Sequence, residues 1–261
     1  MPFDQEEFLR LITDHYEFCH RVYWNDLPIS RALLGGWPEI PPEVLAGLQK
    51  NDGAVNLIRN LPYPEFSRDR QYSSFTPLLM FDTQVIDYRL DYVQESIVCD
   101  ELESKPEPFT TLDPPLPASC VCIARCYSRN GYFVVVDTED GYVYWGDPNG
   151  EHDEPEPELK KTLERFEDDD VNDWRVYGVN VYTPADFFAL CKHRFREMRW
   201  IGTGHWYISA VRMNIDSDNF GFERGHDVMV GLLREAGWPG DGEGRDWDPA
   251  KFHALLENAR W

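Results

Sequence analysis

The fold of this 261-residue chain is decided by one stretch, Tyr132-Phe-Val-Val-Val-Asp137, followed by Thr138-Glu-Asp-Gly141 and Tyr142-Val-Tyr-Trp145. Two runs of β-branched and aromatic residues flank an Asp-Gly dipeptide, a pattern that strongly indicates a β-hairpin. We expect a further strand before this hairpin, over 120–127, and another after it, over 176–181. The sequence therefore predicts a sheet in the middle of the chain.

Helices are expected on both sides of this sheet. Apolar side chains between Phe8 and Val22 recur every three or four residues, which predicts an amphipathic helix over 3–24. The clearest helix is expected over 183–198, where Thr183 is suited to cap the helix and Pro184 fits the first turn. Shorter elements are expected as helices over 42–49, 54–61, 159–166, 226–236 and 249–259, as strands over 200–201 and 206–213, and as an edge strand over 83–93.

The order of these elements indicates the fold class. Strands and helices do not alternate regularly, so we expect an α+β protein with a mostly antiparallel central sheet flanked by helices, and with extra C-terminal helices. Five prolines between 106 and 117 predict an exposed loop over about 104–118. We expect one domain over 1–215 and a helical extension over 216–261 that packs on it.

The charge is strongly negative and unevenly distributed. The chain carries 25 Lys and Arg against 47 Asp and Glu, a net charge of −22. Residues 99–173 hold 20 acidic and 6 basic side chains, whereas residues 174–215 hold 2 acidic and 6 basic ones. Because a chain this acidic is repelled by a phosphate backbone and by an anionic membrane, we expect neither nucleic acid nor membrane as a partner.

Two acidic tracts, 151–158 and 167–170, contain most of the charge in the middle of the chain. Their simplest interpretation is a solvated loop and a helix end. The alternative is a docking surface for a basic or mixed-charge protein, in which Glu154, Glu156, Asp168 and Asp169 would contact the partner. Neither tract has the spacing of a calcium loop, and we expect no metal and no cofactor.

An aromatic residue and a loop histidine are the other candidates for a site. Trp145, next to Gly146 and Asp147, is our choice for a functional aromatic side chain, because tryptophan supplies both area and a polar group. His205, in the stretch Gly202-Thr-Gly-His-Trp206, could act as a general base, with Glu223 or Asp227 as its acid partner. These three residues define an alternative function, a cofactor-independent enzyme acting on a small organic substrate in an aromatic-lined pocket.

The cysteines and the start of the chain indicate where the protein works. Cys120, Cys122 and Cys126 fall on one face of a predicted strand, where free cysteines act as small apolar side chains. The sequence contains no C-x-x-C pair, so it gives no indication of a zinc site. Residues 1–8 lack the pattern of a signal peptide, and no apolar run is long enough for a membrane span, so we expect a cytoplasmic protein without disulfides.

Part of the sequence is similar to a known family. The hairpin with its Gly146-Asp147 end, the acidic insert and the helix start at 183–190 resemble the core of the SUKH superfamily, as does the upstream segment 40–53 with its Asn-Asp-Gly turn. The superfamily includes bacterial toxin-immunity proteins and fungal regulators of cell-wall glucan synthesis. The phrases Ile86-Asp-Tyr-Arg89 and Leu233-Arg-Glu-Ala-Gly-Trp-Pro239 are similar to uncharacterised proteins of filamentous fungi.

The resemblance covers residues 35–200, and this chain departs from the family in its long segment 54–118 and in its tail after 200. It implies a non-catalytic, cytoplasmic protein-binding module with an immunity-like or regulatory role. We therefore expect binding of a protein through an acidic surface, with a small-molecule ligand as a further option.

Overall fold

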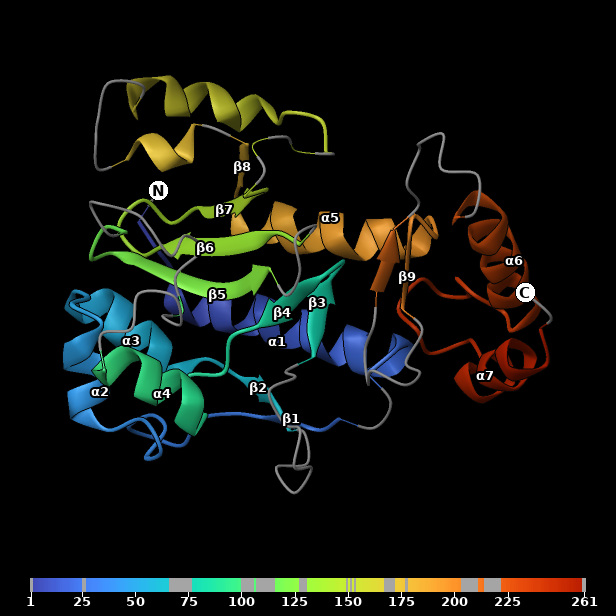
Figure 1. Cartoon of the computed structure of the whole chain (residues 1–261), viewed down its shortest axis with the longest axis horizontal. Helices are drawn as coiled ribbons and strands as arrows, with labels where there is room; N and C mark the ends of the chain where they lie inside the picture. The colour runs from blue at the N-terminus through green and yellow to red at the C-terminus, as the bar shows by residue number, and fades with distance from the viewer. Residues whose placement is uncertain are drawn as a thin grey trace.

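The computed structural model describes residues 2–24, 27–65, 77–99, 106, 116–126, 131–148, 150, 152, 154–166, 172–176, 178–202, 211–213 and 222–259. In this part of the chain, helices and a six-stranded antiparallel sheet form an α+β protein (Figure 1). The predicted fold class is confirmed.

The central sheet is a meander in which each strand pairs with its neighbour in the sequence. Its strands in spatial order are β3 (Leu78–Met80), β4 (Thr83–Val85), β5 (Cys120–Cys126), β6 (Phe133–Asp137), β7 (Val143–Gly146) and β8 (Val179–Tyr182). The predicted hairpin is confirmed: Val136 of β6 lies opposite Val143 of β7, and Gly141 takes a φ of +78° in the turn. Both strands are buried along their whole length, so the hairpin forms the centre of the core.

Helices α1 (Gln5–Val22) and α5 (Pro184–Arg196) pack against each other and against the sheet (Figure 1). The ring centroids of Phe8 and Phe188 lie 6.0 Å apart between the helices, and those of Phe187 and Trp145 lie 5.9 Å apart between α5 and β7. Thr183 caps α5 as expected, because its side chain accepts a hydrogen bond from the backbone of the first turn.

The segment 83–93 is not an edge strand, and here the prediction was wrong. Strand β4 ends at Val85 and lies between β3 and β5, while Asp91–Val98 form helix α4. The strand ends because the Asp87 carboxylate accepts hydrogen bonds from both the backbone and the side chain of Arg89, which turns the chain. The charges of Asp87 and Arg89 in this segment therefore form a buried ion pair and do not belong to a solvated edge.

The remaining elements surround this core. They are β1 (Ile29–Ser30), α2 (Pro42–Gly47), α3 (Asp52–Asn60), β2 (Tyr63–Pro64), the 3-10 helices η1 (Glu158–Phe166) and η2 (Asp173–Arg175), β9 (Trp200–Gly202), β10 (Val211–Met213), α6 (Phe222–Glu235) and α7 (Pro249–Asn258). In Figure 1, α2, α3 and α4 gather at one end of the molecule, and α6 and α7 lie at the other. Most of the predicted proline-rich loop lies outside the described residues, although Pro106 and Leu116 are buried.

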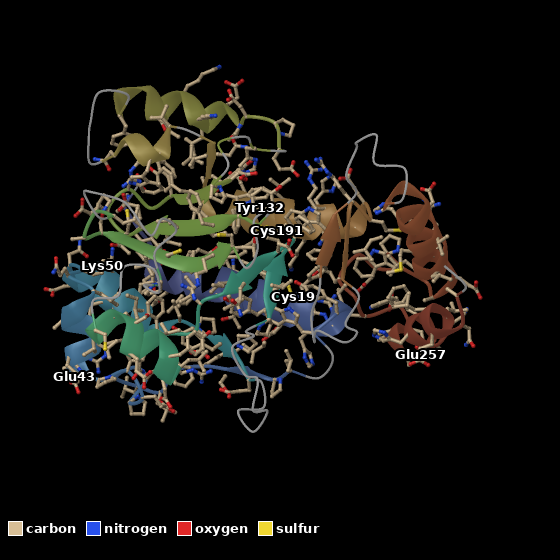
Figure 2. All side chains as sticks on the ribbon, viewed as in Figure 1. Cys19, Glu43, Lys50, Tyr132, Cys191 and Glu257 are labelled. Atoms are coloured by element: carbon tan, nitrogen blue, oxygen red, sulfur yellow. The ribbon has the colours of Figure 1, made fainter. Side chains whose placement is uncertain are left out.

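The strand cysteines follow the prediction in part. Cys120 and Cys122 are buried, whereas Cys126 is half-buried beyond a register shift between positions 122 and 124. Cys19 of α1 and Cys191 of α5 are also fully buried (Figure 2). Burial raises the pKa of Cys19 and of Cys120 to about 12, so both are uncharged thiols at neutral pH.

Candidate functional site

Trp145 lies inside the molecule. Its side chain has no exposed area, and Asn180 lies opposite it on β8. The rings around it include those of Tyr132, His152, Tyr182, Phe187 and Trp200. The structure therefore places Trp145 at the centre of an aromatic cluster that joins the sheet to α5 and β9, where a ligand from solvent does not reach it.

Glu154 is buried as well, and this corrects the expectation that it belongs to a solvated acidic surface. Its carboxylate accepts two hydrogen bonds from the Arg194 guanidinium, one of them from Nε at 2.7 Å. The Nη1 atom of Arg199 lies 3.6 Å from the same carboxylate. Because the Glu154 side chain is only 2% exposed, its charge holds the end of α5 to the acidic segment and is not available to a partner.

The other acids of the first tract that the structure describes are largely neutralised by nearby lysines. Glu156 is exposed but lies 2.6 Å from Lys160, whose hydrogen bond lowers the pKa of that carboxyl group. Glu158 pairs with Lys161 at 2.5 Å. Asp147 is half-buried at the end of β7. Asp168 and Asp169, in the second tract, lie outside the described residues.

The proposed acid–base residues are not brought together in the part of the chain that the structure describes. His205 lies outside that part, as does the side chain of Glu223 in α6. Asp227 is exposed on α6.

An open hollow of about 460 Å³ lies along α1 beside the loop that follows β1. It is lined by Leu9, Arg10, Thr13, Asp14, Glu17 and Arg31. The two arginines already pair with glutamates, each at 2.6 Å. Among the described residues, the lining of the hollow contains no tryptophan or histidine, so it differs from the aromatic-lined pocket expected for an acid–base enzyme.

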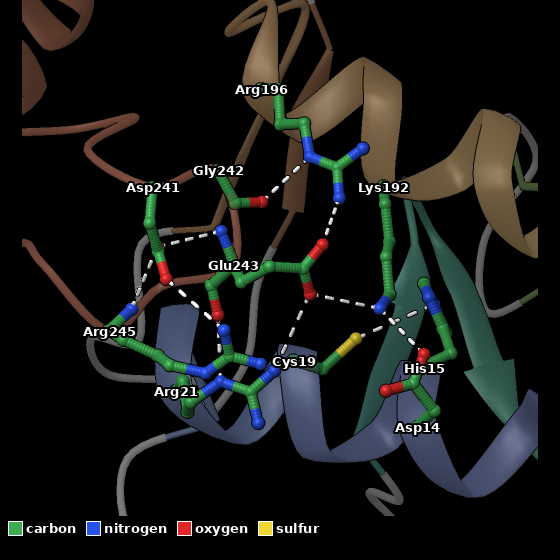
Figure 3. A network of polar contacts seen from close by, with 10 residues as sticks. All are labelled: Asp14, His15, Cys19, Arg21, Lys192, Arg196, Asp241, Gly242, Glu243 and Arg245. Carbon is green, nitrogen blue, oxygen red and sulfur yellow. Dashed lines mark hydrogen bonds and ion pairs between the residues drawn. The ribbon is translucent and has the colours of Figure 1, made fainter.

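A network of charged side chains joins the C-terminal segment to α1 and α5 (Figure 3). The Glu243 carboxylate accepts hydrogen bonds from Arg196 and from Lys192, the latter at 3.1 Å, and lies 3.8 Å from Arg21. Lys192 also donates to Asp14 at 2.7 Å. Lys192 and Arg196, two of the six basic residues over 174–215, are therefore balanced by acids on α1 and on the loop before α7.

His15 lies beneath this network. Its position next to a cysteine is typical of a catalytic histidine, but its burial and its pKa are not. Its Nε2 atom lies 3.5 Å from the Cys19 sulfur, and both side chains are fully buried. Burial, together with the charge of Lys192, lowers the pKa of His15 to about 3. The imidazole is therefore neutral at physiological pH and is part of the core.

The Asp-x-Arg sequence at 87–89 forms a second buried charged cluster, which sequence reasoning did not identify as a structural unit. The Arg89 guanidinium donates to Asp87 at 2.8 and 3.0 Å and to Glu65 at 2.7 Å. The same group lies 4.4 Å from the ring centroid of Trp37 and 4.7 Å from that of Tyr63. Two aromatic rings thus pack against the buried cation, and the cluster joins β2 to the turn before α4.

Unpaired acids occur on a different surface, which we name the acidic helical face. It is formed by α2, by α4 and by the loop before α2. Its residues are Glu39, Glu43, Asp91, Tyr92, Glu95 and Val98. None of its four acids makes an ion pair within the described chain, and its apolar members Tyr92 and Val98 are 36% and 57% exposed. The sequence signal is the 3–4 residue spacing of 91, 95 and 98, which the strand predicted over 83–93 cuts at its start.

By its architecture, the chain is an α+β protein built on a six-stranded antiparallel meander. Comparison with protein-family models, with curated proteins and with solved structures finds no match to it. Across the described residues, no helix has both the length and the apolar character needed to cross a membrane. The same residues contain no group of three or more His, Cys, Asp and Glu side chains arranged to hold a metal.

Proposed function

We propose that this protein is a non-catalytic, intracellular binding module whose acidic helical face recognises a basic or mixed-charge protein. The proposal is supported mainly by the exposure of Glu43, Asp91 and Glu95, which make no ion pair in the described chain. Glu154 and Glu243 are used by the fold itself, whereas Asp227, Glu235 and Glu257 on α6 and α7 are also exposed without ion pairs in the described chain. Among the described residues of α6 and α7, only Val228 is an exposed large apolar side chain, so charge and apolar area are combined mainly on the acidic helical face.

Charge and apolar area occur together on this face, which suits protein recognition. An exposed ion pair contributes only about 0.2–1 kcal/mol, so carboxylates alone attract a partner without holding it tightly. The exposed Tyr92 and Val98 on α4 provide apolar area that a partner can cover. A relationship to the SUKH superfamily, proposed from the sequence alone, would imply the same kind of function.

The test compares two triple variants with the same change in net charge. One neutralises the face, by Glu43→Gln, Asp91→Asn and Glu95→Gln. The other neutralises three exposed acids on α6 and α7, by Asp227→Asn, Glu235→Gln and Glu257→Gln. Glu43 and Glu257 lie at opposite ends of the molecule (Figure 2), so the second variant controls for total charge.

Each protein is used for affinity capture from a lysate of the source cells at low and at high salt. The captured protein is then purified and its affinity measured by calorimetry. We expect the face variant to weaken binding about tenfold, which corresponds to three exposed pairs, and the control variant to weaken it less than twofold. Equal loss in both variants, or no salt-sensitive partner, would overturn the proposal.

A further inference from the structure

The loop between β1 and α2 ends in a turn that presents two leucines to solvent. Leu33 is 73% exposed and Leu34 is fully exposed. Together with Tyr92 and Val98, they are four of the five large apolar side chains that are exposed among the described residues; the fifth is Val228 on α6. Apolar exposure among the described residues is therefore concentrated at the end of the molecule that also carries the acidic helical face.

The backbone of this turn is held by hydrogen bonds. The backbone N–H of Gly36 donates to the carbonyl of Leu33 at 2.9 Å, and Arg59 of α3 donates from its side chain to the carbonyl of Gly35 at 3.0 Å. A Cβ atom at Gly36 would lie 2.9 Å from Arg59, so the turn approaches α3 as closely as glycine permits. Since the backbone is already ordered, burying the leucines against a partner costs little additional conformational entropy.

The turn is also tied to the acidic helical face. The side chain of Gln94 on α4 donates to the carbonyl of Glu39 at 2.7 Å, only five residues after Leu34. In Figure 1 the loop runs past α4 to reach α2. The leucines and the carboxylates thus face partners from the same end of the fold.

We propose that Leu33 and Leu34 are the apolar anchor of the interface, inserted into an apolar pocket with a lysine- and arginine-rich rim on a folded partner protein. The inference rests on the proposed function and adds the shape of the partner. Two exposed leucines on an ordered turn fit a concave apolar site, and the four acids of the acidic helical face, at the same end of the fold, fit a basic rim. A second copy of this chain would bring like charges together, and an anionic bilayer would repel the same acids.

The anchor is tested with Leu33→Ser/Leu34→Ser, and with Val228→Ser as the exposed apolar control. Both sets of residues are exposed, so the unfolding free energy should stay unchanged and is measured first. Proteins carrying a benzoylphenylalanine photo-crosslinker at position 34 or at position 228 are irradiated in the lysate. We expect a crosslink from position 34 to a basic protein, and at least a 30-fold affinity loss for the leucine variant against that purified protein. Val228→Ser should change the affinity less than twofold.

Several results would overturn the anchor, and they separate it from the proposed function. If the face variant weakens binding but the leucine variant changes it less than threefold, the anchor is wrong and the acidic helical face stands. If neither variant weakens binding, both proposals fail. Leucine-dependent flotation with phosphatidylcholine vesicles, with or without phosphatidylserine, would indicate a membrane anchor instead. Leucine-dependent dimerisation in analytical ultracentrifugation would indicate a second copy.

Discussion

Replacing Glu154 with glutamine tests whether this acid belongs to the fold or to a recognition surface. The substitution keeps the shape of the side chain but removes its charge, and it leaves Arg194 with a neutral neighbour. Removing one partner of a buried ion pair typically costs about 3–5 kcal/mol. Because Arg194 is 14% exposed and keeps a contact of 2.8 Å to Glu197, we expect a smaller loss of about 2–3 kcal/mol in unfolding free energy.

Glu156→Gln is the matched control, two residues away. Its carboxylate is 73% exposed and its contact with Lys160 lies on the surface, so we expect a loss below about 0.5 kcal/mol. Both variants are unfolded in urea and followed by tryptophan fluorescence, with partner binding measured alongside. Equal stability of the two variants, or a binding defect in Glu154→Gln without a loss of stability, would refute the structural role of Glu154.

Three further results are expected. The pKa of His15 is lowered to about 3 from an ordinary 6.5, so its contribution to stability is complete above pH 6.5 and falls as the pH drops toward 3. At pH 5 the loss is about 2 kcal/mol, and His15→Leu should flatten this part of the pH–stability curve; an unchanged slope would contradict the assignment. Gly202→Ala should destabilise strongly, because its Cβ would lie 2.2 Å from the Tyr23 ring, whereas Gly231→Ala in an open helical position should stabilise by about 0.5–1 kcal/mol. Thermal melting of the two proteins compares them directly, and a similar change in both would show that the Gly202 contact is not as tight as described. Glu243→Gln should speed hydrogen exchange in α6 and α7 more than in the sheet, since it weakens the contacts of Figure 3; uniform exchange would argue that the network does not hold this segment.

The parts of the fold that the sequence predicts are those with local signals. The hairpin around Gly141 follows from its turn residues and flanking β-formers. The helix after Thr183 follows from its cap and its proline. Such features depend on residues within one or two turns, so a single sequence contains them.

The candidate site was harder to predict because charge has different meanings in different surroundings. Glu154 reads as part of a solvated tract, but its arginine partner is 40 residues away. Asp87 and Arg89 read as exposed strand residues, but they pair with each other inside the molecule. Only the folded chain distinguishes these acids from Glu43 and Glu95, which remain without ion pairs in the part of the chain described here.

The tertiary contacts of α1 also determine when this helix can finish packing during synthesis. Arg21 of α1 donates to the backbone of Glu243, 222 residues later, and Asp14 accepts from Lys192, 178 residues later. The meander strands pair with their neighbours in the sequence and can assemble as they leave the ribosome, whereas α1 waits with its apolar side uncovered until α5 and the following loop have been made. The side of α1 that packs on α5 is therefore covered only after the sheet has been made, and until then it exposes apolar surface on the newly made chain.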